Sequence, residues 1–161
     1  KKGKGKALFP KLTNIGYHCW LSKDKVALFL VDESKGHRLV IGNATTGKTK
    51  HVAFNVGRCL KTSKSGNLIY LDKEIEGNWK LKTIKSDTGQ TILLGNSMPD
   101  EEDFEVLPDG YIVAGHNGSI YKLVPEKGSV WIAVASLKSY IKDKRITRIA
   151  SKANRLVVVV E

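Results

Sequence analysis

Charged, aromatic and hydroxyl side chains stand at the start of four segments of this sequence where a buried strand should carry apolar residues. Arginine offers paired N–H donors that fit a carboxylate or the carbonyl groups of a peptide. We therefore predict a site that binds a protein or peptide partner, made of Tyr17, His18, Arg58, Glu102, Asp103, Arg145, Thr147 and Arg148. In the alternative interpretation, Arg58, Asp103 and Arg148 form ion pairs between structural units or cap strand ends.

Catalytic motifs are not evident in the sequence. None of the four histidines follows a nucleophile elbow, and neither a Gly-x-Ser-x-Gly nor a His-Glu-x-x-His pattern occurs. The acidic run at 100–103 lacks the Gly and the terminal Glu of an EF-hand, and is expected to be a solvated loop. We predict no catalytic residue, no metal site and no cofactor, and a protein that is not an enzyme.

A repeated phrase supplies the elements that must position these residues. It reads as a strand, a tight turn and a second strand, and recurs at intervals of roughly 40–45 residues, a period typical of propeller repeats. The turns contain Ser65-Gly66-Asn67 and Pro108-Asp109-Gly110, which provide the positive φ that a short hairpin needs. The four copies occupy residues 19–28, 60–69, 104–113 and 149–158.

Each copy is followed by a second hairpin with a glycine at its turn. The turns are Thr-Gly at 46–47 and 88–89, and Pro-Glu-Lys-Gly at 125–128. Four antiparallel strands in a meander make one blade of a β-propeller, so the fold class is all-β with almost no helix, apart from a helical turn at 136–140. We predict one partial propeller domain over 1–161, with blades at about 15–55, 56–97 and 102–136 and partial blade strands at 5–10 and 145–160.

Three blades and two partial ones would leave sheet edges and apolar blade faces exposed. We expect the ring to be completed by further sequence or by a second copy of the chain, and a six-bladed ring is the natural result. An open solenoid and a β-sandwich are the structural alternatives.

The segment Phe104-Glu105-Val106-Leu107-Pro108-Asp109-Gly110, followed by an apolar strand, resembles the Phe-Ala-Trp-Ser-Pro-Asp-Gly repeat of TolB-like bacterial propellers. The blade order from residue 16 to 161 is similar to the C-terminal half of that family. The resemblance implies a periplasmic or secreted protein whose propeller binds proteins or peptides, usually without chemistry.

The net charge of +11, from 27 Lys and Arg against 16 Asp and Glu, suggests nucleic acid as a partner. The lysines, however, recur at alternate strand positions and in turns, which is typical of a solvated face. Nucleic acid is therefore not the expected partner. Cys19 and Cys59 are expected to be small core side chains, with a disulfide between them as the alternative.

Three functions follow from these observations. The first is a noncatalytic propeller that binds a protein or peptide on its channel face. The second is a propeller hydrolase or lactonase, and the third is a structural fragment that self-associates to complete a ring.

Overall fold

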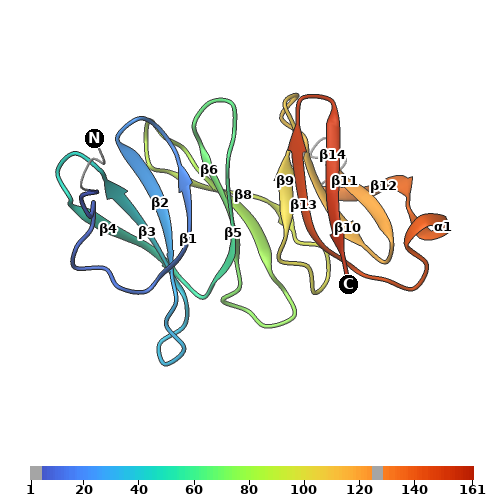
Figure 1. Cartoon of the computed structure of the whole chain (residues 1–161), viewed down its shortest axis with the longest axis horizontal. Coiled ribbons are helices and arrows are strands. Elements are labelled where there is room, and N and C mark those ends of the chain that lie inside the picture. Colours follow the sequence, from blue (N-terminus) through green and yellow to red (C-terminus); the bar gives the residue numbers. More distant parts are fainter. Residues whose placement is uncertain (1–4, 125–128) are drawn as a thin grey trace.

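The computed structural model describes residues 5–124 and 129–161, and strands dominate it (Figure 1). The Pro-Glu-Lys-Gly turn expected at 125–128 lies outside the described residues. No helix in the described ranges is long and apolar enough to cross a membrane. The elements are β1 (Ile15–Trp20), β2 (Lys25–Leu30), β3 (Arg38–Asn43), β4 (Thr49–Phe54), β5 (Val56–Thr62), β6 (Leu68–Asp72), β7 (Lys80–Ile84), β8 (Thr91–Asn96), β9 (Phe104–Val106), β10 (Ile112–His116), β11 (Ser119–Val124), β12 (Val130–Ser136), the helix α1 (Lys138–Ile141), β13 (Ile146–Lys152) and β14 (Arg155–Val160).

The strands form three four-stranded sheets, β1 to β4, β5 to β8 and β9 to β12, and a two-stranded sheet of β13 and β14. Within each sheet every strand pairs antiparallel with its neighbour in the chain. The expected all-β fold, with three four-stranded blades and a further hairpin, is therefore confirmed. The predicted turn glycines have the left-handed backbone that these hairpins require, with φ of +78° at Gly66 and +92° at Gly110.

The first strands of the four sheets, β1, β5, β9 and β13, lie side by side on one side of the molecule (Figure 1). We call this side the inner face, and the end at which these four strands begin the entry end. The second strands lie behind them, and β6 is buried along its whole length. Burial on both faces explains why β2, β6 and β10 are largely continuous apolar runs rather than alternating ones.

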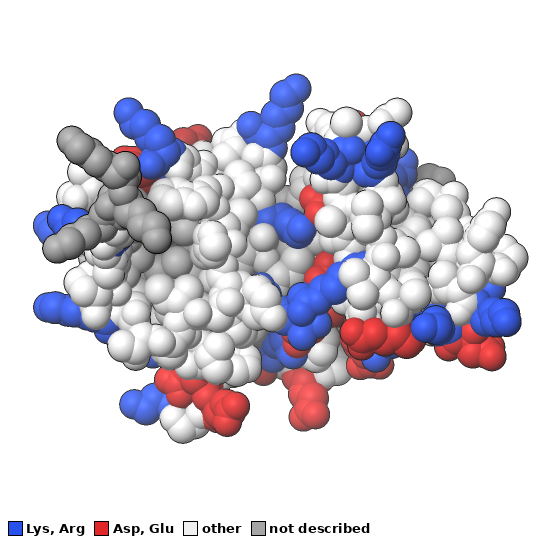
Figure 2. Space-filling model, in the orientation of Figure 1, with Lys and Arg blue, Asp and Glu red and all other residues white. Residues whose placement is uncertain are grey.

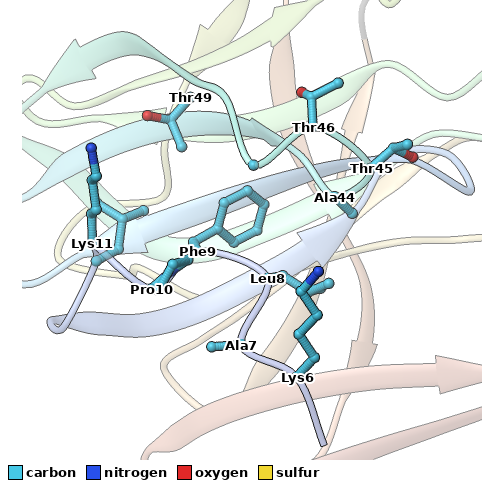
Figure 3. Close-up of a pocket in the computed structure, with 12 residues that line it drawn as sticks. Lys6, Ala7, Leu8, Phe9, Pro10, Lys11, Ala44, Thr45, Thr46 and Thr49 are labelled. Carbon is cyan, nitrogen blue, oxygen red and sulfur yellow. The ribbon is translucent and has the colours of Figure 1, made fainter.

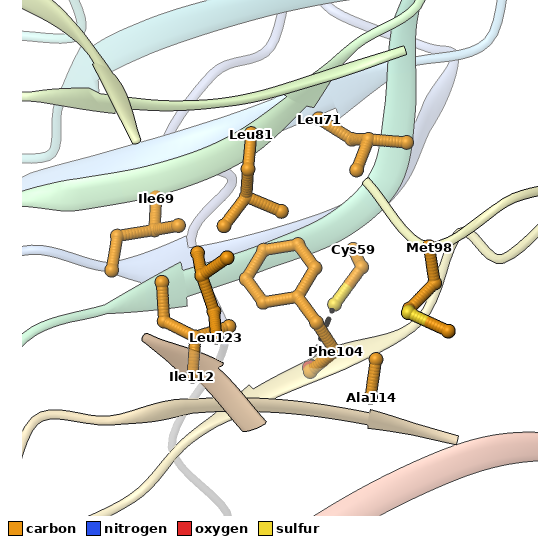
Figure 4. Packing of buried hydrophobic residues seen from close by; sticks show 9 residues of the cluster. All are labelled: Cys59, Ile69, Leu71, Leu81, Met98, Phe104, Ile112, Ala114 and Leu123. Atoms are coloured by element: carbon orange, nitrogen blue, oxygen red, sulfur yellow. Dashed lines mark hydrogen bonds between the residues drawn. The ribbon is translucent and has the colours of Figure 1, made fainter. Parts of the chain in front are cut away.

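The hydrophobic core lies between neighbouring blades. Phe104 of β9 is 2% exposed and packs among Leu71 and Leu81 of the second blade and Leu123 of its own blade (Figure 4). Cys59 belongs to the same cluster, and its thiol donates to the Phe104 carbonyl at 3.2 Å. Both cysteines are free thiols, so the core interpretation holds for Cys59 and the disulfide alternative is wrong.

The segment at 5–10 forms no strand, contrary to the sequence prediction. It crosses the first blade as irregular chain, opposite the β3–β4 turn, and borders a hollow of about 490 Å³ (Figure 3). Phe9 is buried against Val26, Leu28 and Val40, and its ring occupies the space that a side chain at Gly42 would need. Packing of the Phe9 ring against the first blade therefore holds this segment, which makes no strand hydrogen bonds to the sheet.

Candidate functional site

Irregular strand register aims three side chains at the inner face. β1 shifts register between Ile15 and Tyr17, β5 between Val56 and Leu60, and β13 between Ile146 and Arg148. Such bulges commonly re-aim a side chain at a barrel rim or an active site. All three lie at the entry end, where Tyr17, Arg58 and Arg148 occur.

Glycines accompany two of these shifts because the backbone approaches the second strand closely there. A Cβ added at Gly16 would lie 2.9 Å from Val31 Cγ2, and one at Gly57 would lie 2.9 Å from Leu71 Cβ. The dipeptides Gly16-Tyr17 and Gly57-Arg58 therefore have the same role in two blades. The glycine allows the first and second strands to approach, and the next residue carries the polar side chain. Thr147 takes the corresponding place before Arg148.

Arg148 connects the fourth blade with the third and the first. Its Nη1 lies 3.4 Å from Asp103 Oδ2, and its Nη2 donates to the Tyr17 hydroxyl at 3.4 Å. The guanidinium carbon also lies 5.8 Å from the centre of the Tyr17 ring, within cation–π range. The hydrogen bond to Tyr17 and then that to Asp103 hold the pKa of Arg148 above its usual value, although the partial desolvation of the group opposes them. The side chain is thus a fixed cation at the inner face.

Asp103 fixes the start of the fourth blade from the other side. Its Oδ1 accepts the backbone N–H of Ile149 at 3.2 Å, while Oδ2 faces Arg148. The carboxylate is largely buried, at 14% exposure. It therefore holds both the backbone of β13 and the side chain that β13 directs toward Tyr17.

Glu102, the neighbour of Asp103, faces the second blade. One of its oxygens accepts from Lys73, and the other lies 3.8 Å from Arg58 Nε, beyond hydrogen-bond distance. In the described part of the chain, the buried Nε of Arg58 has no hydrogen-bond partner. Arg58 thus brings a cation with an unused donor to the inner face, and its side chain is 38% exposed.

The acidic run at 100–103 is not the solvated loop that the sequence predicted. Glu101 is buried, and its two oxygens face His116 at 3.3 Å and Arg145 at 3.2 Å. Glu102 and Asp103 face cations of two further strands, as described above. Glu101, Glu102 and Asp103 lie where the third blade meets its neighbours, and each faces a cation from another element. Asp100 alone is exposed, as the sequence predicted for the whole run.

Five of the eight predicted site residues meet at the inner face, at the entry end: Tyr17, Arg58, Glu102, Asp103 and Arg148. Figure 2 shows blue and red side chains gathered in the hollow between the two halves of this side. His18 instead borders a separate apolar hollow with Leu8 and Trp20, because consecutive strand residues point to opposite sides. Thr147 donates within its own blade, to the Val159 carbonyl at 3.5 Å. Arg145 lies beside Glu101 and not in the cluster around Arg148.

Sequence reasoning missed Lys73 and His116, which partner Glu102 and Glu101. Lys73 follows the second strand β6 and His116 ends the second strand β10, so both lie next to connections whose lengths differ between blades. A usable signal was Asp72-Lys73, a charged pair at the end of a fully buried strand.

Comparisons with known proteins rest on structure. No protein-family model matches the chain, and no curated protein matches it in sequence. The chain is similar to a puromycin hydrolase mutant solved in complex with PGG, with a TM-score of 0.68 at 17% identity over 92% of this chain and 25% of that one. A protein described as a gluconolactonase gives 0.61 at 14% identity, over 89% of this chain and 54% of that one. The tricorn protease gives 0.54 at 17% identity, over 88% and 14%.

The fold is that of a β-propeller. At these identities the likeness extends to the fold and no further, and the chain spans about a quarter of the puromycin hydrolase and about half of the gluconolactonase. The three neighbours are propeller proteins without being specifically TolB-like.

The prediction that this protein is not an enzyme is contradicted. The three similar structures are a hydrolase, a lactonase and a protease by description. The sequence argument failed because it searched for contiguous catalytic motifs, whereas propellers and other common folds carry chemistry on residues from separate loops.

Proposed function

We propose that this chain belongs to a TolB-like β-propeller that binds a peptide, or an extended segment of a partner protein, at the entry end of its inner face. The observation that carries the proposal is the contact of Arg148 with both Tyr17 and Asp103, which joins three blades around one exposed cation. A ligand bound there would touch several blades at once.

The donors of this cluster suit the oxygen atoms of a peptide. Tyr17 accepts from Arg148, so its own hydroxyl hydrogen is free to donate to a ligand. The side chains of Arg58 and Arg148 are 38% and 40% exposed, and the contacts to their carboxylates are 3.8 Å and 3.4 Å long. A ligand carboxylate or carbonyl can compete with contacts of that length, because charge-assisted hydrogen bonds of good geometry are about 2.7–2.9 Å.

A peptide-binding propeller fits a hydrolytic enzyme as well as a binding protein. The second candidate is a propeller whose inner face holds the substrate of an enzyme; structures described as a hydrolase and a protease share the fold. The same cluster would then orient a peptide substrate for catalytic residues located on other loops or domains.

The test is binding of a positional-scanning library of tetrapeptides, followed by the chemical shifts of the side chains in the cluster. We expect Arg58→Ala and Arg148→Ala each to weaken binding at least tenfold. Arg155→Ala is the matched control, since Arg155 is exposed at the opposite end of the β13–β14 hairpin. Unchanged binding in both cluster variants would refute the proposed site.

Two further parts of the hypothesis remain proposals. The TolB resemblance supports a periplasmic or secreted protein, which fractionation of the producing cell would test. Completion of the ring by a second copy would bury the apolar residues of β14, where Val157 is 61% and Val159 47% exposed, and the mass in solution would reveal it.

A further inference from the structure

A hollow of about 510 Å³ opens where the β10–β11 turn meets the connection between α1 and β13. It lies at the entry end, beyond the Arg148 cluster. Lys and Arg side chains, with acidic side chains beside them, lie at the lower right of Figure 2, below the position of α1 in Figure 1. We call it the basic hollow, and its polar lining is Asn117, Lys138, Lys142, Asp143, Lys144 and Arg145.

The charge of the basic hollow is strongly one-sided. Four of its lining side chains are cations and one, Asp143, is a carboxylate. Like charges gathered around one concavity repel each other and create a positive potential that attracts an anion. An anion with more than one negative charge would relieve this repulsion most.

Contacts that centre on the buried carboxylate of Glu101 connect the two walls of the basic hollow. Arg145 donates through Nη2 to the Asp100 carbonyl at 2.8 Å and to Glu101 at 3.2 Å. Glu101 is buried and also faces His116, whose Nε2 lies 2.9 Å from the Asn117 amide. A chain of contacts thus runs from Arg145 to Asn117, one on each wall. Within the described residues, Glu101 pairs with Arg145 and His116 and not with the lysines of the lining.

The backbone of both walls is also unusual. Lys142 has a φ of +52° and Asn117 a φ of +46°, in the left-handed region that side chains rarely adopt. Asparagine tolerates this region, but lysine gains nothing from it. Non-glycine residues held there are concentrated at ligand sites and switch regions, because the surrounding structure has to impose the conformation.

We propose that the basic hollow binds a phosphate group, either as inorganic phosphate or as a phosphate ester. Lysine is a point charge that binds phosphate from several directions, and one arginine adds a planar set of donors. Arg145 already faces Glu101, so the remaining charge of the lining is that of three lysines and one carboxylate, Asp143. A ligand with a single negative charge would compensate half of this excess. A phosphate dianion matches it and has acceptor oxygens for all three lysines. This site is separate from the peptide site proposed above.

The experiment is a titration of the full chain with inorganic phosphate, phenyl phosphate and acetate at low ionic strength, followed by amide chemical shifts. We expect saturable shifts at Asn117, Gly118 and Lys142 with both phosphates, and binding of acetate at least tenfold weaker. Tighter binding of phenyl phosphate than of inorganic phosphate would identify an ester as the natural ligand, and the reverse would identify the free ion.

The variant Lys138→Gln/Lys142→Gln should weaken phosphate binding at least tenfold. The control is Lys23→Gln/Lys64→Gln, which removes the same charge from exposed turns at the opposite end of the blades. All four lysines are exposed, so both variants should fold, and their melting curves verify this. Linear shifts without saturation, acetate binding equal to phosphate, or an equal loss in the control would overturn the proposal.

Discussion

Arg148 and Tyr17 are 131 residues apart in the chain, yet Arg148 Nη2 donates to the Tyr17 hydroxyl at 3.4 Å. The contact connects the first inner strand with the last, across β5 and β9. It is made by exposed side chains, while the buried Asp103 fixes the arginine from behind. The cluster therefore combines a rigid base with an accessible tip, as a binding site requires.

Tyr17→Phe should separate the binding role of this contact from its contribution to stability. The variant keeps the ring that stacks beside Arg148 and removes one hydrogen bond between exposed groups. We expect the free energy of unfolding to fall by less than about 1 kcal/mol, because solvent screens such contacts. Peptide binding should weaken several-fold. Urea unfolding and the tetrapeptide titration measure the two effects, and a large loss of stability with unchanged binding would assign Tyr17 a purely structural role.

Asp103→Ala should, in contrast, reduce the stability of the fold substantially. It removes a largely buried carboxylate and leaves the Ile149 N–H and the Arg148 guanidinium without their acceptor. We expect a loss of about 1–3 kcal/mol, the cost of unsatisfied buried partners. Hydrogen exchange should show the loss first at the Ile149 amide and along β13. Asp109→Ala, in an exposed turn of the same blade, is the control. It removes only the exposed hydrogen bond from the Tyr111 N–H, so the loss of stability should be smaller and exchange at the Ile149 amide should not change.

The repeat explains why much of this cluster could be predicted from the sequence. Equivalent positions in consecutive blades become neighbours on the inner face, so Arg58, Asp103 and Arg148 could be assigned together from the sequence. They form the ion pairs between blades that the alternative interpretation predicted, and the two arginines are also partly exposed.

Other positions could not be predicted because their direction or contacts are not periodic. Selecting both Tyr17 and His18, or both Thr147 and Arg148, places one residue of each pair on the wrong side of its strand. The apolar run around Phe9 has the pattern of a strand, but it forms irregular chain because the Phe9 ring packs in the space above Gly42. Lys73 follows β6 and His116 ends β10, so both reach the acidic run from the ends of second strands, where the connections to the third strands differ in length between blades.

Gly57→Ala should damage the site through the backbone. The new methyl group would lie 2.9 Å from Leu71 Cβ, and neither strand can move without disturbing the core around Phe104. We expect a loss of about 1–3 kcal/mol from overpacking, together with weaker peptide binding as Arg58 is displaced. Gly5→Ala meets nothing within 4 Å and is the control. Wild-type stability and binding in Gly57→Ala would show that the register shift of β5 does not depend on glycine.

The free energy of unfolding should fall in alkaline solution because the core contains a buried thiol, Cys59, and a buried phenol, Tyr70. Burial, and then the negative charge of Asp103, raise the pKa of Cys59 from an ordinary value of 9.0 to about 12. Burial likewise raises the pKa of Tyr70 from 10.0 to about 12. Both groups stay neutral in the folded protein at a pH where the unfolded chain has already lost their protons. Their contribution is fully present below about pH 9 and is lost as the pH rises toward 12.

Urea unfolding measured from about pH 8 to about pH 11 tests this dependence. Cys59→Ala should lower stability at all pH values, because it leaves a gap beside Phe104, but the decline above pH 9 should become shallower. Cys19→Ala is the matched control, since that thiol is only half-buried and should leave the slope as in the wild type. If Cys59→Ala keeps the full alkaline slope, ionisation of the Cys59 thiol in the unfolded chain is not the cause, and Tyr70 must account for the decline.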